Sequence, residues 1–226
     1  MHSSNMKPER KIDTTQQDPI TDNKPADTRK RILDAAERLF GDKGLDVTFR
    51  ELTEAANVNV AAIHYHFGSK ERLLSELFIE RTKPVVEGRL KKLREVPRDA
   101  LGKAKLEDIL DAFLVPALEL QSSAENGEAF LRLRARLAFD SVQSQNLVSA
   151  VFDESNGLFI EEFCRALPEI PKEEIYWRFH FLLGAVHYTM ANSQRISRLS
   201  KGMINPRAKG NTIPRLISFF VAGFKH

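Results

Sequence analysis

The chain has 226 residues, of which 42% are hydrophobic, and a formal net charge of +3, so it can bury a sizeable core and is only mildly basic. Its one cysteine, Cys164, excludes an intrachain disulfide and any metal site built from cysteines. The sequence has neither an apolar leader nor an apolar run long enough to cross a bilayer, and we expect a cytoplasmic protein without a membrane partner.

Residues 1–25 are polar, contain three prolines and show no helical periodicity, which predicts a disordered arm. The arm carries four basic residues: Lys7, Arg10, Lys11 and Lys24. These side chains either contact DNA phosphates or the minor groove, or belong to a solvated tail.

The first predicted helix runs from Asp27, as its N-cap, to about Asp42, and Gly44 ends it. Its apolar residues fall on one face at helical spacing: Ile32, Ala35, Ala36, Leu39 and Phe40.

Two short helices follow, Thr48–Ala56 and Asn59–Phe67, joined by only two residues. Thr48 and Glu51 have the spacing of a capping box, and Asn59 is a good N-cap for the second helix. Asn57 tolerates the left-handed conformation that a tight turn between helices needs. Together with the first helix, these features predict a helix-turn-helix in a three-helix DNA-binding domain, residues 26–72.

The second short helix is expected to enter the major groove of DNA. Small residues near its start allow close approach to base edges, and three rings further along can form hydrogen bonds. Apolar residues face the other way and are expected to be buried at the crossing: Leu52, Ala55, Val58, Ile63 and Phe67. The residues expected to contact DNA are Thr48, Arg50, Asn59, Ala61, Ala62, His64, Tyr65, His66 and Lys70.

Basic residues are few in this region, and charges between residues 27 and 72 are nearly balanced. Affinity for DNA would then depend on a small number of cations: Arg29, Lys30, Arg50 and Lys70. Ser69 is a predicted N-cap, so Lys70 stands in the first turn of the next helix. A cation there opposes the helix dipole unless a phosphate binds beside it.

The pattern from Ile32 to Phe40, followed by Gly44, Thr48 and the run from Ala61 to Lys70, resembles TetR-type transcriptional regulators. The resemblance covers roughly residues 27–80. It implies an all-α homodimer that binds a palindromic operator, with a C-terminal part, residues 73–226, that binds a small molecule. The chain departs from the family at Asn57, where glycine is usual, and at Asn59, where serine is commoner. Both changes are conservative for the backbone and bear on base preference.

The rest of the chain is predicted to be helical, because no strand-like alternation of useful length occurs. Pro116 predicts a kink near Val115, and residues Ser122 to Gly127 are expected to form a polar loop. The predicted helices are Ser69 to about Arg94, Lys103 to about Gln121, Glu128 to about Gln143, Asn146–Ala166, Lys172 to about Ser197, and Thr212–Lys225.

The helix that begins at Lys172 is apolar on two faces, so both must be covered. One face carries Trp177, Phe181, Gly184 and Tyr188. We expect the other face and the last helix to form an isologous dimer interface, the alternative being a central helix of a monomer. The expected interface residues are Phe179, Leu183, Val186, Met190, Ile213, Leu216, Ile217 and Phe220.

Aromatic residues lie on the helices that would line a small-molecule cavity in this architecture, although such stripes usually form core. Arg134 stands among apolar residues and cannot lose its proton, so it needs an anionic partner. That partner is either a protein carboxylate or the head group of a bound acid. The expected ligand-binding residues are Phe113, Phe130, Arg134, Phe152, Phe159, Trp177 and Phe181.

Two segments, Asn59–Lys70 and Tyr176–Ala185, are similar to the branch of the TetR family that includes repressors responsive to fatty acids or their acyl-CoA esters. This similarity implies an apolar or amphipathic effector that releases the protein from DNA. Aromatic drugs and plant phenolics are alternative effectors.

An enzymatic function is not indicated. His180 and His187 are seven residues apart, about 10.5 Å along a helix, which is too far for one metal ion. The sequence contains no glycine-rich phosphate loop, nucleophile elbow or paired-carboxylate motif, so we expect no catalytic residues, no metal and no cofactor. The remaining alternative is an interaction module that binds DNA only weakly and without sequence preference.

Overall fold

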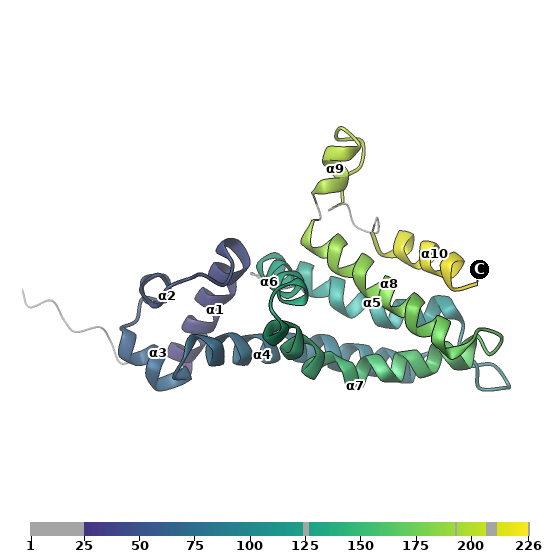
Figure 1. Cartoon of the computed structure of the whole chain (residues 1–226), viewed down its shortest axis with the longest axis horizontal. Coiled ribbons are helices and arrows are strands. Elements are labelled where there is room, and N and C mark those ends of the chain that lie inside the picture. Colours follow the sequence, from purple (N-terminus) through teal and green to yellow (C-terminus); the bar gives the residue numbers. More distant parts are fainter. Residues whose placement is uncertain (1–24, 124–126, 193, 207–211, 226) are drawn as a thin grey trace, which may run out of the picture.

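The computed structural model describes residues 25–123, 127–192, 194–206 and 212–225, and these ranges contain ten α-helices (Figure 1). The predicted all-α fold is confirmed. The helices are α1 (Pro25–Lys43), α2 (Phe49–Ala56), α3 (Val60–Phe67), α4 (Lys70–Glu95), α5 (Leu106–Ser123), α6 (Gly127–Phe139), α7 (Val142–Ala166), α8 (Lys172–Ala191), α9 (Arg195–Leu199) and α10 (Thr212–Lys225). Among the described helices, none combines the length and the apolar character that a membrane span requires.

Several helix boundaries differ from the predicted ones. α1 begins at Pro25, which places Asp27 in its first turn and not at the cap, and α5 begins at Leu106. The predicted disordered arm lies outside the described residues except for Pro25. Of the predicted polar loop, Ser122 and Ser123 belong to α5 and Gly127 begins α6, while 124–126 lie outside the described residues.

The helix predicted to run from Glu128 to Gln143 ends at Phe139, and α7 begins at Val142 and not at Asn146. Ser141 causes this break, because its hydroxyl accepts a hydrogen bond from the Ser144 amide and so caps α7. The helix predicted to extend to Ser197 ends at Ala191, and the short α9 follows as a separate element.

α1, α2, α3 and the first turns of α4 form a unit at one end of the molecule, and the long α4 runs from it into the C-terminal body (Figure 1). The core of this unit is apolar and fully buried: Ile32, Phe40, Leu52, Ile63, Phe67 and Leu73. In the body, α5, α6 and α7 pack on one another, α8 packs on α6 and α7, and α10 covers α5 and α8. α4 therefore belongs to both parts.

α1 is also held directly by α6. The backbones are so close at Gly41 that a Cβ atom there would lie 2.3 Å from the carbonyl oxygen of Ala129. Beside this contact Arg132 pairs with Asp42, and its Nε donates to the Gly41 carbonyl at 3.4 Å. Only glycine permits such an approach of two helices.

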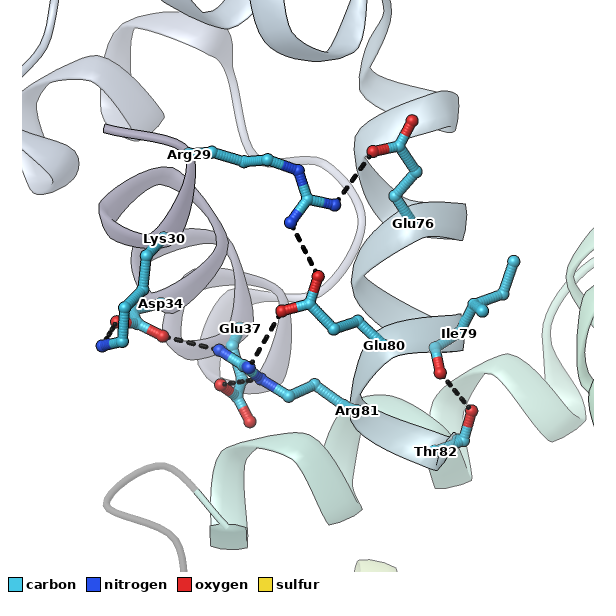
Figure 2. A network of polar contacts seen from close by, with 9 residues as sticks. All are labelled: Arg29, Lys30, Asp34, Glu37, Glu76, Ile79, Glu80, Arg81 and Thr82. Atoms are coloured by element: carbon cyan, nitrogen blue, oxygen red, sulfur yellow. Dashed lines mark hydrogen bonds and ion pairs between the residues drawn. The ribbon is translucent and has the colours of Figure 1, made fainter. Parts of the chain in front are cut away.

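Ion pairs join α1 to α4 on another side, as Figure 2 shows. Arg29 binds Glu76 at 3.2 Å and Glu80 at 2.7 Å. Arg81, which directly follows Glu80 on α4, binds Asp34 at 2.5 Å and the buried Glu37 at 3.0 Å. Because Glu37 is almost fully buried, its pair with Arg81 is less screened by water than a surface pair. Contacts with α4 and α6 together fix the position of α1.

Candidate DNA-binding surface and ligand site

The turn between α2 and α3 has the predicted geometry. The Thr48 amide donates to the Glu51 carboxylate at 2.9 Å, and the Thr48 hydroxyl accepts from the Glu51 amide at 3.3 Å, so the capping box is confirmed. Lys43 also binds Glu51, and this bond and those from Thr48 lower the pKa of the Glu51 carboxyl to about 2. Asn57 is left-handed, with φ 52° and ψ 54°.

The α3 residues predicted to contact bases are exposed or partly exposed. The Asn59 side chain caps the helix by accepting from the Ala62 amide at 2.8 Å. Tyr65 is 81% exposed, and its ring meets that of His66 edge to face. His64 is exposed, but its Nδ1 lies 2.9 Å from the Gly68 carbonyl oxygen. Nε2 is therefore the ring nitrogen that does not take part in this contact.

Burial beneath α3 follows the prediction with one error. Ile63, Phe67 and Leu52 are fully buried, and Val58 is partly buried against the core. Ala55 was predicted to be buried but is exposed, and Ala56 is buried in its place. Ala56 lies four residues after Leu52 and therefore on the same face of α2, whereas Ala55 lies beside that face.

The predicted cations already have partners in the protein. Arg50 pairs with Glu54 at 2.9 Å, and Lys30 pairs with Asp34 at 2.8 Å. Lys70 turns back onto the loop before α2, where its ammonium group donates to the carbonyls of Leu45 and Val47 at 2.9 and 3.3 Å. Lys70 therefore anchors this loop to α4, and its predicted contact with a phosphate stays a prediction.

The C-terminal body contains two buried arginines. Arg134 on α6 was predicted, and it is 2% exposed; Arg89 on α4 was not predicted, and it is fully buried. Arg89 belongs to a stripe of buried residues at helical spacing that also contains Phe78, Val85 and Leu93, so a helical wheel of α4 could have identified it.

The guanidinium groups lie against aromatic rings. The central carbon of Arg89 lies 3.7 Å from the centre of the Phe113 ring and 5.6 Å from that of Phe152. The corresponding carbon of Arg134 is 4.4 Å from the same Phe152 ring. Both cations are therefore neighbours of one phenylalanine.

Most of the hydrogen-bonding capacity of these two groups is unused. Arg89 Nε donates to the Phe113 carbonyl at 2.8 Å, but its Nη1 and Nη2 have no partner. Arg134 Nε and Nη1 have no partner either. No ion pair links either arginine to a carboxylate within the described part of the chain, so the alternative of a protein carboxylate finds no support there.

Burial weakens the charged state of the groups around Phe152. It lowers the pKa of Arg134 to about 10, which leaves this side chain protonated at neutral pH. Burial, and then the charge of Arg134, lower the pKa of Arg89. Burial and both arginines lower the pKa of His187 to about 3, so the imidazole is neutral.

The other predicted ligand-binding residues divide into two groups. Four phenylalanines are buried around the arginines: Phe113, Phe130, Phe152 and Phe159. Trp177 and Phe181 do not join this group, because they are 52% and 59% exposed on the outer face of α8.

The two faces of α8 are reversed with respect to the prediction. Residues assigned to a partner chain pack within this chain: Phe179, Val186, Met190 and Phe220 are buried, and Leu183, Ile213, Leu216 and Ile217 are partly buried against the core. The exposed aromatic residues instead include Trp177, Phe181 and Tyr188 on α8, and Phe219 is exposed on α10. Because both faces of α8 are apolar, only its packing against other helices shows which face is buried within the chain.

Two family descriptions match the chain. Residues 32–77 match the description "Bacterial regulatory proteins, tetR family", and residues 111–223 match "Tetracyclin repressor-like, C-terminal domain". Together they cover the DNA-binding unit and most of the C-terminal body.

Curated relatives are similar over parts of their length. The regulator BetI of Rhizobium meliloti is 51% identical over 47 residues, 20% of this chain and 23% of BetI. The regulator AcrR of Shigella flexneri is 28% identical over 146 residues, 64% of this chain and 63% of AcrR. The repressor AcnR of Corynebacterium efficiens is 34% identical over 107 residues, 46% and 57% of the two chains. The matches therefore span less than two thirds of each of these relatives.

Solved structures share the fold along almost the whole chain. The fatty acid degradation regulator FadR from Bacillus halodurans superposes with a TM-score of 0.65 and 15% identity, over 88% of this chain and 97% of that one. FadR from Bacillus subtilis, in complex with stearoyl-CoA, has a TM-score of 0.65 and 14% identity, over 86% and 98% of the two chains.

Proposed function

The chain belongs to the TetR family of DNA-binding transcriptional regulators, which is not a family of enzymes, and from this premise we propose that it is a repressor released from a palindromic operator by a small effector. The observation that carries the proposal is a pair of buried guanidinium groups, those of Arg89 and Arg134, in each of which two nitrogen atoms have no hydrogen-bond partner. They stand on α4 and α6, the two helices that hold α1 in place.

α4 and α6 would couple effector binding to release from DNA. An effector that binds at Arg89 and Arg134 acts on the inner faces of α4 and α6, while Arg81 and Arg132 on the same helices bind α1. A small movement of either helix would then change the position of α3 in the DNA. Coupling of this kind corresponds to a preference of about 1 to 3 kcal/mol of the effector for one arrangement.

A homodimer is part of the proposal. The outer face of α8 and α10 exposes four aromatic side chains, and exposed apolar patches of this kind are typical of protein interfaces. A two-fold contact through this face would place two α3 helices on successive turns of the major groove, and the operator would be a palindrome.

The effector is proposed to be apolar or amphipathic, with a fatty acid or an acyl-CoA as the first candidates. Support comes from the resemblance of two segments to fatty-acid-responsive regulators and from the fold shared with the two FadR proteins, one of which holds stearoyl-CoA. Since the operator lies on bacterial DNA, the protein would act in the cytoplasm.

The domain division is retained as a proposal, with DNA binding in residues 26–72 and ligand binding and dimerisation in 73–226. α4 crosses this boundary without interruption, so the division separates functions and not rigid bodies.

Selection of binding sites from random DNA duplexes at physiological salt tests the proposal. The wild-type protein should enrich a palindrome, and Tyr65→Ala should weaken binding to it about 10-fold or more, because a specific base contact contributes about 1–3 kcal/mol. Met203→Ala, at a position 86% exposed and distant from α3 in sequence, is the control for loss of an exposed side chain. Absence of any enriched sequence would contradict the proposal.

A further inference from the structure

Arg89 and Arg134 identify the chemical class of the effector. Building on the proposed function, we propose that the effector is a free carboxylic acid with an apolar body, and that its carboxylate binds between the guanidinium groups of Arg89 and Arg134. The hydrocarbon or aromatic body then lies against the phenylalanines around them.

The first argument is that no carboxylate pairs with Arg89 or Arg134 among the residues that the structure describes. Two permanent cations are 0% and 2% exposed, and four of their nitrogen atoms have no hydrogen-bond partner. Burial of a charge without a counter-ion is strongly unfavourable, and stacking on Phe113 and Phe152 offsets only part of that cost. A bound anion would supply the missing acceptors.

The second argument is that the two cations face a common region. Both guanidinium groups lie within 6 Å of the Phe152 ring centre, at 5.6 Å and 4.4 Å. The charge of Arg134 helps to lower the pKa of Arg89, and the charges of both arginines help to lower the pKa of His187. An anion bound beside the Phe152 ring would lie near both arginines, while a neutral ligand would leave their repulsion in place.

The third argument concerns the size and shape of the head group. The planar fork of a guanidinium group matches the two oxygens of a carboxylate. Because the two arginines are inside the helical body, a compact group with one charge fits them better than a coenzyme A moiety, which carries several phosphates and needs contact with water.

The fourth argument is the apolar surrounding. Phe113 packs edge to face on Phe159 at 5.1 Å between ring centres, and Phe130 and Phe152 both pack on Phe78 at 6.0 and 6.2 Å. Rings of this kind favour a ligand body without polar groups.

Isothermal titration calorimetry on the full-length protein without DNA tests this inference. The probes are carboxylates from butanoate to hexadecanoate and phenylacetate, the alcohol that corresponds to each, and dodecanoyl-CoA. At least one carboxylate should bind about 10-fold or more tightly than its alcohol, since the alcohol cannot neutralise the arginines. Arg89→Met and Arg134→Met should each weaken that carboxylate about 10-fold or more.

Two further variants make the result specific. Arg94→Met removes an exposed arginine from the same helix as Arg89 and should leave binding unchanged. Arg134→Lys keeps a positive charge, and it should restore part of the binding lost in Arg134→Met, which a mere packing defect would not allow. Thermal unfolding followed by circular dichroism verifies that each variant is folded.

Three results would overturn the inference: equal affinity for acid and alcohol, acid binding that survives both methionine substitutions, or binding of dodecanoyl-CoA without binding of any free acid. Failure to bind any acid by a protein that still selects an operator would also overturn it and leave the proposed regulator intact. Conversely, acid binding by a protein that selects no DNA would contradict the proposed function alone.

Discussion

Side chains at the helix ends were predictable because their chemistry is local. Thr48, Asn59 and Ser69 each accept a hydrogen bond from an amide three residues later, and the sequence contains all that such a cap requires. Burial in the body was less predictable. Arg134 was identified because it falls inside the apolar arc of its helix, whereas Arg89 was missed in a long, highly charged helix whose buried stripe is narrow.

Arg134 gives a prediction about stability at the residue scale. Replacement of an unpaired buried charge by an apolar side chain of similar length removes a desolvation cost. Without ligand, Arg134→Met should raise the free energy of unfolding by about 1–4 kcal/mol in urea titrations. Arg132→Met, on the same helix, should not stabilise the protein, because Arg132 pairs with Asp42 at the surface. Destabilisation by Arg134→Met would mean that this arginine has a partner anion in the chain.

His187 gives a prediction about pH. Its pKa of about 3 in the folded protein lies below the ordinary value of 6.5, so the unfolded chain binds a proton first as the pH falls. The neutral imidazole therefore contributes fully to the free energy of unfolding above about pH 6.5. This contribution is lost as the pH falls towards 3, at up to about 1.4 kcal/mol per pH unit.

Urea unfolding of the wild type and of His187→Gln at several pH values measures this effect. The stability of the wild type should fall more steeply than that of His187→Gln between about pH 6 and pH 4. Parallel curves would show that His187 titrates normally in the folded protein.

At the scale of helices, α2, α3 and α4 were predicted within one residue, because each begins with a clear cap. The boundary between α6 and α7 was misplaced, since apolar spacing continues through Phe139 and the Ser141 cap was overlooked. The orientation of α8 could not be derived at all. Its two faces are equally apolar in sequence, and contacts with α6 and α7 decide which one is inside.

The contact of α1 with α6 gives a prediction for these elements. In Gly41→Ala the new Cβ would lie 2.3 Å from the Ala129 carbonyl oxygen, so the two helices must separate. We expect a loss of about 1–3 kcal/mol in urea unfolding, as for other overpacked contacts, together with weaker operator binding without effector. Gly157→Ala on α7 is the matched control, since a Cβ there meets nothing within 4 Å, and it should stabilise the helix slightly. Equal stability of the two variants would disprove the tight contact.

At the scale of the whole molecule, the proposed dimer depends on the outer face of α8 and α10. Phe181→Asp places a charge in this face and should yield a monomer in sedimentation velocity with operator affinity reduced about 10-fold or more, because a monomer reads one half-site. Leu101→Asp changes an equally apolar residue, 81% exposed in the loop after α4, and should remain a dimer. If the Phe181→Asp protein stayed dimeric, the dimer interface would have to lie on another surface.

The central claim is that ligand binding in the C-terminal body weakens DNA binding by the N-terminal unit. Fluorescence anisotropy of the selected operator, titrated with the protein in the absence and presence of the carboxylate that binds best, measures this coupling directly. The account predicts that the carboxylate weakens operator affinity by a factor of about 5 to 150 in the wild type and has no effect in Arg134→Met. Unchanged operator affinity at a saturating concentration of bound carboxylate would contradict it.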